Sequence, residues 1–145
     1  MGLRSREKGK RFERAIANEF RARWPEAVVR RASQADRAHQ SDVYITGGPP
    51  VLARLWCECQ DARVVTPIAK LKQAERDAWV MSALNRLPLA ITHRLGERTT
   101  YVTTRLWVLD EIRVMPRDMS DAVVTIELSG FLDVVEQHAT RGQRD

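Results

Sequence analysis

The spacing of apolar residues predicts that the chain begins with a long helix. Phe12, Ile16 and Phe20 recur at intervals of four residues, and Pro25 ends the pattern. A helix over about residues 5–24 would place these three side chains on one buried stripe. Glu13 would then lie at the border of that stripe, where it could lean over the edge of a sheet.

The same pattern predicts two more helices and six strands. Thr66 and Pro67 are an N-cap residue and an N1 proline, so a helix is expected over about 67–86, and a short last helix over 131–138. Strands are expected at about 27–31, 42–46, 51–59, 89–93, 100–108 and 122–128. This order indicates one α/β domain over residues 1–145, with a frayed tail from about residue 139.

The second and third predicted strands are separated by a Gly-Gly-Pro-Pro turn at 47–50, which favours antiparallel pairing between them. In such a hairpin the start of one strand lies beside the end of the other. Asp42 and Glu58 would therefore be neighbours.

The third of these strands carries polar residues where apolar ones are expected. Because successive side chains of a strand point to opposite faces, Trp56, Glu58 and Gln60 share one face, and Cys57 and Cys59 share the other with Leu55. A buried carboxylate is costly unless a cation, a hydrogen-bond network or a cleft accommodates it. The strand therefore indicates a functional site, although Glu58 paired with an arginine would satisfy the same requirement.

Composition adds a candidate partner. The formal net charge is +5 and the pI about 9.8, with 20 Arg against 4 Lys, and the basic residues are concentrated before residue 32. A polyanion such as nucleic acid is the natural partner for such a segment. A solvated helix face is the alternative explanation.

The cysteines and the hydropathy limit the remaining classes. Cys57 and Cys59 lie two apart on one strand face, where pairing with each other is unfavourable, so both are expected to be reduced core residues. No apolar run approaches the roughly 18 to 20 residues of a membrane span, and the basic start lacks the apolar region of a signal peptide. A cytoplasmic location is expected, in the host cytoplasm if the protein is viral.

Four short segments carry a resemblance to a known family. They are Lys8-Gly9-Lys10-Arg11-Phe12-Glu13-Arg14, Val29-Arg30-Arg31-Ala32-Ser33, Ser41-Asp42-Val43 and Cys57-Glu58-Cys59-Gln60. In this order they resemble the PD-(D/E)xK nuclease superfamily, and within it the archaeal-type and phage Holliday junction resolvases. The resemblance covers about the first half of the chain. It implies a restriction-endonuclease-like fold, with a central mixed β-sheet flanked by helices, and a homodimer acting on four-way DNA junctions.

Two positions depart from the family pattern. Ser41 stands in place of the motif's proline, and Gln60 stands in place of its lysine. The family's lysine is thought to activate the attacking water and stabilise charge on the phosphate, and a neutral amide could orient water without supplying charge. Lys70 or Lys72 at the start of the second long helix could supply the missing charge.

Phosphodiester hydrolysis gives the acidic residues a common role. A hard cation held by oxygen ligands neutralises the phosphate and lowers the pKa of a bound water. Asp42, Glu58 and the backbone carbonyl of Cys59 are the expected ligands of Mg²⁺, with Mn²⁺ as a substitute ion, and Glu13 is a direct or water-mediated ligand. The alternatives are that Asp42 only opens a strand and that Glu13 is an ordinary helix-surface residue.

Several basic and polar residues are expected to contact the DNA backbone. They are Lys8, Lys10, Arg11, Arg30, Arg31, Ser33, Lys70 and Lys72. Each of these also has an alternative role as a solvated surface residue.

The leading hypothesis is a magnesium-dependent, structure-selective DNA endonuclease of the junction-resolvase type, with catalytic residues Glu13, Asp42, Glu58 and Gln60. The alternatives are another nuclease of the same fold, acting in restriction, repair or on single strands, and a catalytically silent nucleic-acid-binding module. An apolar patch within residues 123–135 is a candidate dimer surface. Three tryptophans, Trp56, Trp79 and Trp107, are expected in the core, as is His93.

Overall fold

The chain folds around one six-stranded sheet in the computed structural model, which describes residues 2–33, 40–82 and 85–139. The strands are β1 (Val28–Arg31), β2 (Val43–Thr46), β3 (Leu55–Ala62), β4 (Leu87–Arg94), β5 (Thr100–Arg105) and β6 (Val123–Glu127). The helices are α1 (Leu3–Arg23), α2 (Pro50–Arg54), α3 (Pro67–Ser82), α4 (Leu106–Ile112) and α5 (Leu128–Ala139).

The sheet is mixed, and its strands lie in chain order from β1 to β6. All neighbours pair antiparallel except β3 and β4, which are parallel. A parallel pair needs a crossover connection, and α3 supplies it. The predicted α/β class with a central mixed sheet flanked by helices is therefore confirmed.

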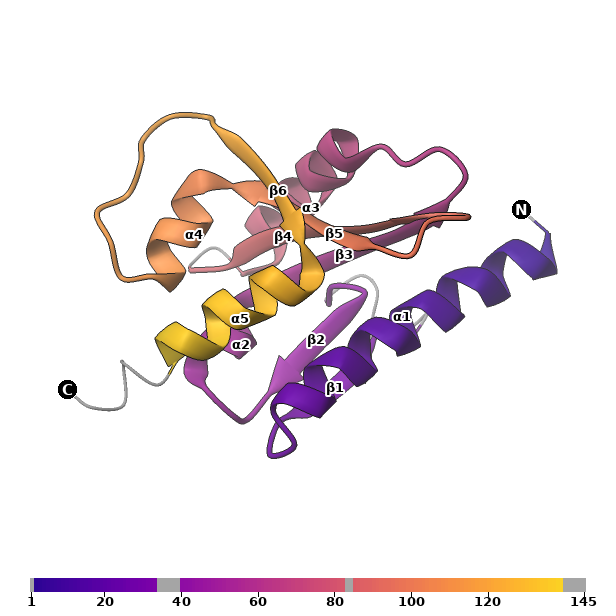
Figure 1. Ribbon diagram of the computed structural model, residues 1–145, viewed down its shortest axis with the longest axis horizontal. Helices are drawn as coiled ribbons and strands as arrows, with labels where there is room; N and C mark the ends of the chain where they lie inside the picture. Colours follow the sequence, from indigo (N-terminus) through magenta and orange to yellow (C-terminus); the bar gives the residue numbers. More distant parts are fainter. Residues whose placement is uncertain (1, 34–39, 83–84, 140–145) are drawn as a thin grey trace.

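Helices cover both faces of this sheet (Figure 1). α1 and α5 close the main core on one face, where fully buried Phe20 and Phe131 belong to one cluster with Leu89 and Ile91 of β4. α3 packs on the other face through Ala74 and Ala78 against the Trp56 ring. β3 and β4 lie between these layers, which explains why both are almost continuously apolar over their first halves.

Two predicted strands are shorter than expected because helices replace one end of each. Residues 50–54 form α2, because Pro50 favours the first turn of a helix and the turn buries the Leu52 side chain fully. The other strand ends at Arg105, and α4 follows, burying Val108 and Ile112 at a spacing of four. Short apolar runs of this kind fit a strand or a buried helix equally well, so the expectation of strands over 51–54 and 106–108 was wrong.

The predicted helix over 67–86 also ends earlier, at Ser82. Asn85 has a positive φ of 66°, a left-handed conformation that follows helix ends and that asparagine tolerates better than most residues. Residues 83–84 of the predicted helix, the loop residues 34–39 and the tail from 140 lie outside the described residues.

The tryptophan and cysteine predictions have mixed outcomes. Trp56 is buried, Trp107 is half-buried, and Trp79 is 78% exposed, so the expectation of a core position for Trp79 was wrong. Cys57 is buried and Cys59 half-buried, and neither forms a disulfide. In the described part of the chain, no helix has the length and apolar character that a membrane crossing requires.

The helix part of the suggested dimer patch is core. Phe131, Leu132 and Val135 of α5 are buried beneath α1 and β5 and cannot offer an apolar surface. Sequence periodicity alone does not distinguish a helix stripe facing its own core from one facing a second copy.

We expect Phe131→Ala to lower the free energy of unfolding by about 3–5 kcal/mol, because it removes a fully buried ring from a packed core. Urea denaturation followed by circular dichroism measures this loss. Ser129→Ala, at an exposed position of the same helix, should change stability by no more than about 0.5 kcal/mol. Unchanged stability with a loss of self-association would instead place Phe131 at a dimer surface.

Candidate active site

Asp42 and Glu58 face each other across the pairing of β2 with β3. Val43 is the register partner of Cys57, and Asp42 and Glu58 are the next residues on the two strands at the same end of this pairing. The Asp42 N–H donates to the Cys57 carbonyl at 3.0 Å, and the Cys59 N–H donates to Asp42 Oδ2 at 2.9 Å. The expected proximity of the two carboxylates is therefore observed.

Ser41 fixes the backbone directly before β2. Its side chain is buried, and its hydroxyl donates to the Val43 carbonyl at 2.6 Å. This local hydrogen bond fixes the backbone on both sides of Asp42, a task that a rigid proline would perform by a different route.

Glu58 is held in an environment that disfavours its charge. Only 5% of Glu58 is exposed to solvent. Burial, the negative charge of Asp42 and a hydrogen bond with Asp42 raise the pKa of Glu58 to about 8. Two groups act in the opposite direction: Trp56 Nε1–H donates to Glu58 Oε1 at 3.1 Å, and Lys70 contributes positive charge. At neutral pH without a cation, Glu58 is therefore mostly protonated.

This donor set fits a hard divalent cation. A strand residue points its N–H and its carbonyl to the same side, and because the Cys59 N–H reaches Asp42, the Cys59 carbonyl also faces the β2 side of β3. Asp42, Glu58 and this carbonyl supply oxygen ligands only, which is what Mg²⁺ prefers when waters complete its coordination. Among the residues that the structure describes, no group of three or more His, Cys, Asp and Glu side chains converges as a metal site.

Glu13 forms an ion pair with Arg31. It is buried in α1, and its Oε2 lies 3.4 Å from Arg31 Nη1, which makes a part-buried ion pair. Its charge and that of Asp42 both contribute, after burial, to raising the pKa of the Cys59 thiol. Glu13 therefore lies near the same edge of β3, on the α1 side, and its expected role as a ligand stays a prediction.

The side chain of Gln60 is engaged by the start of α3. The Thr66 N–H donates to Gln60 Oε1 at 2.8 Å, and Gln60 Nε2 donates to Thr66 Oγ1 at 3.1 Å. This pair ties β3 to the residue before Pro67, where α3 begins. The geometry gives Gln60 a positioning role for α3, and water orientation by its amide stays a prediction.

Lys70 and Lys72 differ in their relation to the pair. Lys70 is half-buried, its Nζ lies 3.2 Å from Gln73 Oε1, and its positive charge lowers the pKa of Glu58. Lys72 is exposed. Of the two lysines considered as substitutes for the missing motif lysine, Lys70 is the one that acts electrostatically on the site.

The other predicted DNA contacts fall in several places. Arg30 is exposed on β1 opposite Tyr44, on the sheet face that carries Asp42 and Glu58. Arg31 points to the other face, towards Glu13. The remaining residues are exposed or half-buried and lie on α1 or directly after β1: Lys8, Lys10, Arg11 and Ser33. Lys10 additionally pairs with Glu7 at 3.4 Å.

Sequence reasoning missed the contact between Trp56 and Glu58. The signal was present, because residues two apart on a strand share a face and a buried indole N–H needs an acceptor. The indole orients the carboxyl and lowers the pKa of Glu58, so Trp56 is part of the site as well as of the core.

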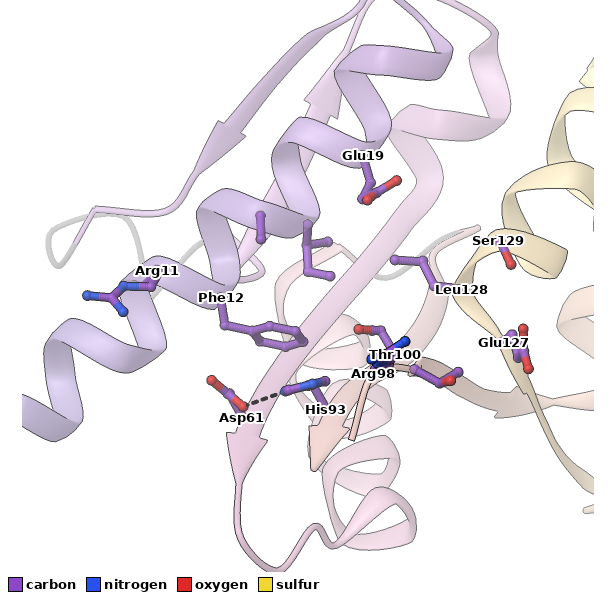
Figure 2. Close-up of a pocket in the computed structure, with 13 residues that line it drawn as sticks. Arg11, Phe12, Glu19, Asp61, His93, Arg98, Thr100, Glu127, Leu128 and Ser129 are labelled. Carbon is purple, nitrogen blue, oxygen red and sulfur yellow. Dashed lines mark hydrogen bonds and ion pairs between the residues drawn. The ribbon is translucent and has the colours of Figure 1, made fainter. Parts of the chain in front are cut away.

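A second polar group lies on the opposite face of β3. There a pocket of about 510 Å³ opens between α1, the turn after β4 and the start of α5, and includes Asp61 and His93 (Figure 2). His93 Nδ1 lies 2.9 Å from Asp61 Oδ1, and Nε2 lies 2.7 Å from the Glu97 carbonyl. The hydrogen bond with Asp61 is the main reason that the pKa of His93 is raised. Both ring nitrogens are engaged, so this pair acts as a tie between β3 and the β4–β5 turn.

Comparison with protein-family models, curated proteins and solved structures found no match for this chain. The candidate site therefore rests on its own geometry and chemistry.

We expect the stability of the metal-free protein to fall as pH rises from about 4.5 to about 8, because folded Glu58 keeps a proton that the unfolded chain has released. Glu58→Gln keeps the shape and the acceptor for Trp56 but cannot ionise. In EDTA, urea denaturation should show the variant close to wild type in acid and more stable by roughly 1–3 kcal/mol above about pH 8. If the stability of both proteins changed with pH by the same slope, the raised pKa could not belong to Glu58.

Proposed function

We propose that the chain is a magnesium-dependent DNA endonuclease that hydrolyses phosphodiesters at the Asp42–Glu58 pair, with four-way junctions as its substrate. The observation that carries the proposal is a pair of carboxyl groups brought together at the end of the β2–β3 pairing, one of them buried with a raised pKa. Pairs of this kind are costly to keep and are typical of sites that bind a cation or perform acid–base chemistry.

The described residues have distinct tasks in this proposal. Asp42 and Glu58 hold the cation through their deprotonated carboxylates, and Trp56 orients Glu58. Bound Mg²⁺ neutralises phosphate charge and lowers the pKa of a coordinated water. Lys70 supplies the positive charge that Gln60 cannot, and Gln60 fixes the start of α3 from which Lys70 projects.

The choice of junction DNA follows from the resemblance to resolvases, which also implies a homodimer with two sites related by a two-fold axis. The positive net charge and exposed Arg30 beside the site favour a DNA substrate. The neighbouring possibilities are a nuclease for linear or single-stranded DNA and a silent binding module. The engagement of Gln60 by Thr66 is the observation that favours the silent module.

We expect the protein with Mg²⁺ to introduce paired nicks near the branch point of an end-labelled four-way junction, and EDTA to abolish them. Asp42→Asn should lower the rate roughly 100-fold or more, because it removes a charged ligand. Denaturing gels of junction, linear duplex and single strand measure both effects.

The matched control is Asp61→Asn, which neutralises a carboxylate three residues from Glu58 on the other face of the same strand. It should leave cleavage within a few-fold of wild type. Cutting of linear or single-stranded DNA instead would keep the site and change the substrate, and binding without any cutting would establish the silent module.

We expect Lys70→Ala to lower kcat/KM by on the order of 100-fold, and Lys72→Ala to lower it only a few-fold. The cleavage rate should rise with pH as Glu58 loses its proton. Because Lys70 lowers the pKa of Glu58, Lys70→Ala should shift this rise to higher pH. Lys70→Arg should restore part of the rate. Equal effects of the two alanine variants on rate, with unchanged pH profiles, would show that Lys70 acts only as a surface charge.

A further inference from the structure

A groove lined by two tryptophans lies on the α3 side of the sheet, away from the carboxylate pair. It has a volume of about 340 Å³, and its walls come from α3, the start of β4, α4 and the segment after α4. The residues that line it include Trp79, Trp107, Arg86, Arg117 and Glu75. Of the two tryptophans, Trp79 is the exposed one, with 78% of its surface accessible to solvent. A large aromatic side chain so exposed in a groove indicates a binding surface.

The charges of the groove favour an anionic occupant. Glu75 is neutralised by a two-point ion pair with Arg105, at 2.9 and 3.1 Å. Glu111 accepts hydrogen bonds from both Arg54 and Arg117, at 3.0 and 2.9 Å, and these pairs lower its pKa. Among the residues that line the groove, two arginines, Arg86 and Arg117, stand against one acid, Glu75, and exposed Arg76 lies on the same helix as Glu75.

Arg117 and Trp107 form a preassembled edge of the groove. The Arg117 guanidinium carbon lies 5.1 Å from the centroid of the Trp107 ring, within cation–π range. The ring and Glu111 together hold the guanidinium in place, which reduces the entropy lost when its remaining N–H groups bind a phosphate.

An exposed aromatic ring beside fixed arginines is the arrangement that binds single-stranded nucleic acid, with a base stacked on the ring and phosphates on the arginines. Bases in an intact duplex are stacked on each other and cannot enter such a groove. A second copy of this chain is a poorer occupant, since a symmetric contact would bring Arg86 and Arg117 against the same arginines of the partner.

We infer that this groove binds one unpaired nucleotide of a single strand, with its base on Trp79 and its phosphate near Arg117. Trp79 follows Lys70 by nine residues on α3, roughly 13 Å along the helix axis and about half a turn around it. The groove is therefore a surface separate from the carboxylate pair, and the binding inferred here does not rest on the proposed nuclease function.

The test is a fluorescence titration of the full chain in EDTA with an oligothymidylate single strand and with a duplex of equal length. Single strand should quench the tryptophan emission and bind more tightly than duplex. Trp79→Ala should remove most of the quenching and weaken binding by on the order of 10-fold, and Trp79→Phe should restore part of the affinity. Arg117→Ala should weaken binding and reduce its salt dependence by about one charge.

Two controls remove exposed side chains elsewhere. Leu3→Ala removes an apolar side chain, and Arg98→Ala removes an arginine that lines the pocket on the opposite face. Neither should change the quenching. Wild-type binding by Trp79→Ala would overturn the inference, as would quenching by an acidic peptide but not by DNA, or self-association that Trp79→Ala abolishes.

Because EDTA prevents metal-dependent cleavage, the two proposals can fail separately. Trp79-dependent binding by a protein that cuts no DNA under Mg²⁺ would support the groove and reject the nuclease. Metal-dependent cutting by a protein whose single-strand binding ignores Trp79 would reject the groove and support the nuclease.

Discussion

The candidate site depends on one register, that of β2 against β3. The two strands share a single paired position, Val43 with Cys57, and the backbone and side chain of Asp42 extend the contact through hydrogen bonds with Cys57 and Cys59. A shift by one residue would turn the side chains of β2 to the opposite face and separate Asp42 from Glu58. The short pairing is therefore reinforced at its end, where Ser41 and Asp42 hold the backbone by local hydrogen bonds.

The same register forces an unfavourable interaction on the fold. Two carboxylates held this close repel each other when both are charged, and burial increases the cost, so Glu58 keeps its proton to a raised pH. The compensation comes from outside the pair: apolar layers on both sides of β3, an indole donor and a lysine on α3. Conflict between local electrostatics and the global fold is expected at functional sites and rare elsewhere. This conflict is the physical reason to regard Asp42 and Glu58 as a functional site.

The sequence predicted the parts of this arrangement that depend on short-range geometry. Alternation along β3 placed Glu58 and Gln60 on one face, and the turn at 47–50 predicted antiparallel pairing with β2, so the proximity of Asp42 followed. The predicted α/β class and mixed sheet also follow from the order of periodic segments.

The features that the sequence did not predict depend on tertiary context. α2 and α4 were expected as strand ends because buried apolar runs carry no clear period. The choice between Lys70 and Lys72 required the rotation of α3 about its axis, which the loop 63–66 sets. Trp79 lies one position after buried Ala78 on a helix whose narrow apolar stripe is formed by alanines, so a small shift in the assigned stripe moves the ring from core to solvent.

α3 is therefore the element that connects the two proposed surfaces. Gln60 and Thr66 attach its beginning to β3, and Ala74 and Ala78 let its middle approach the Trp56 ring closely. Because Trp56 also orients Glu58, the helix and the buried carboxyl share one support. A displacement of α3 would move Lys70 away from the carboxylates and Trp79 away from Trp107 together. Rigid placement of one helix thus couples the charge at the site to the shape of the groove, without requiring any contact between the two.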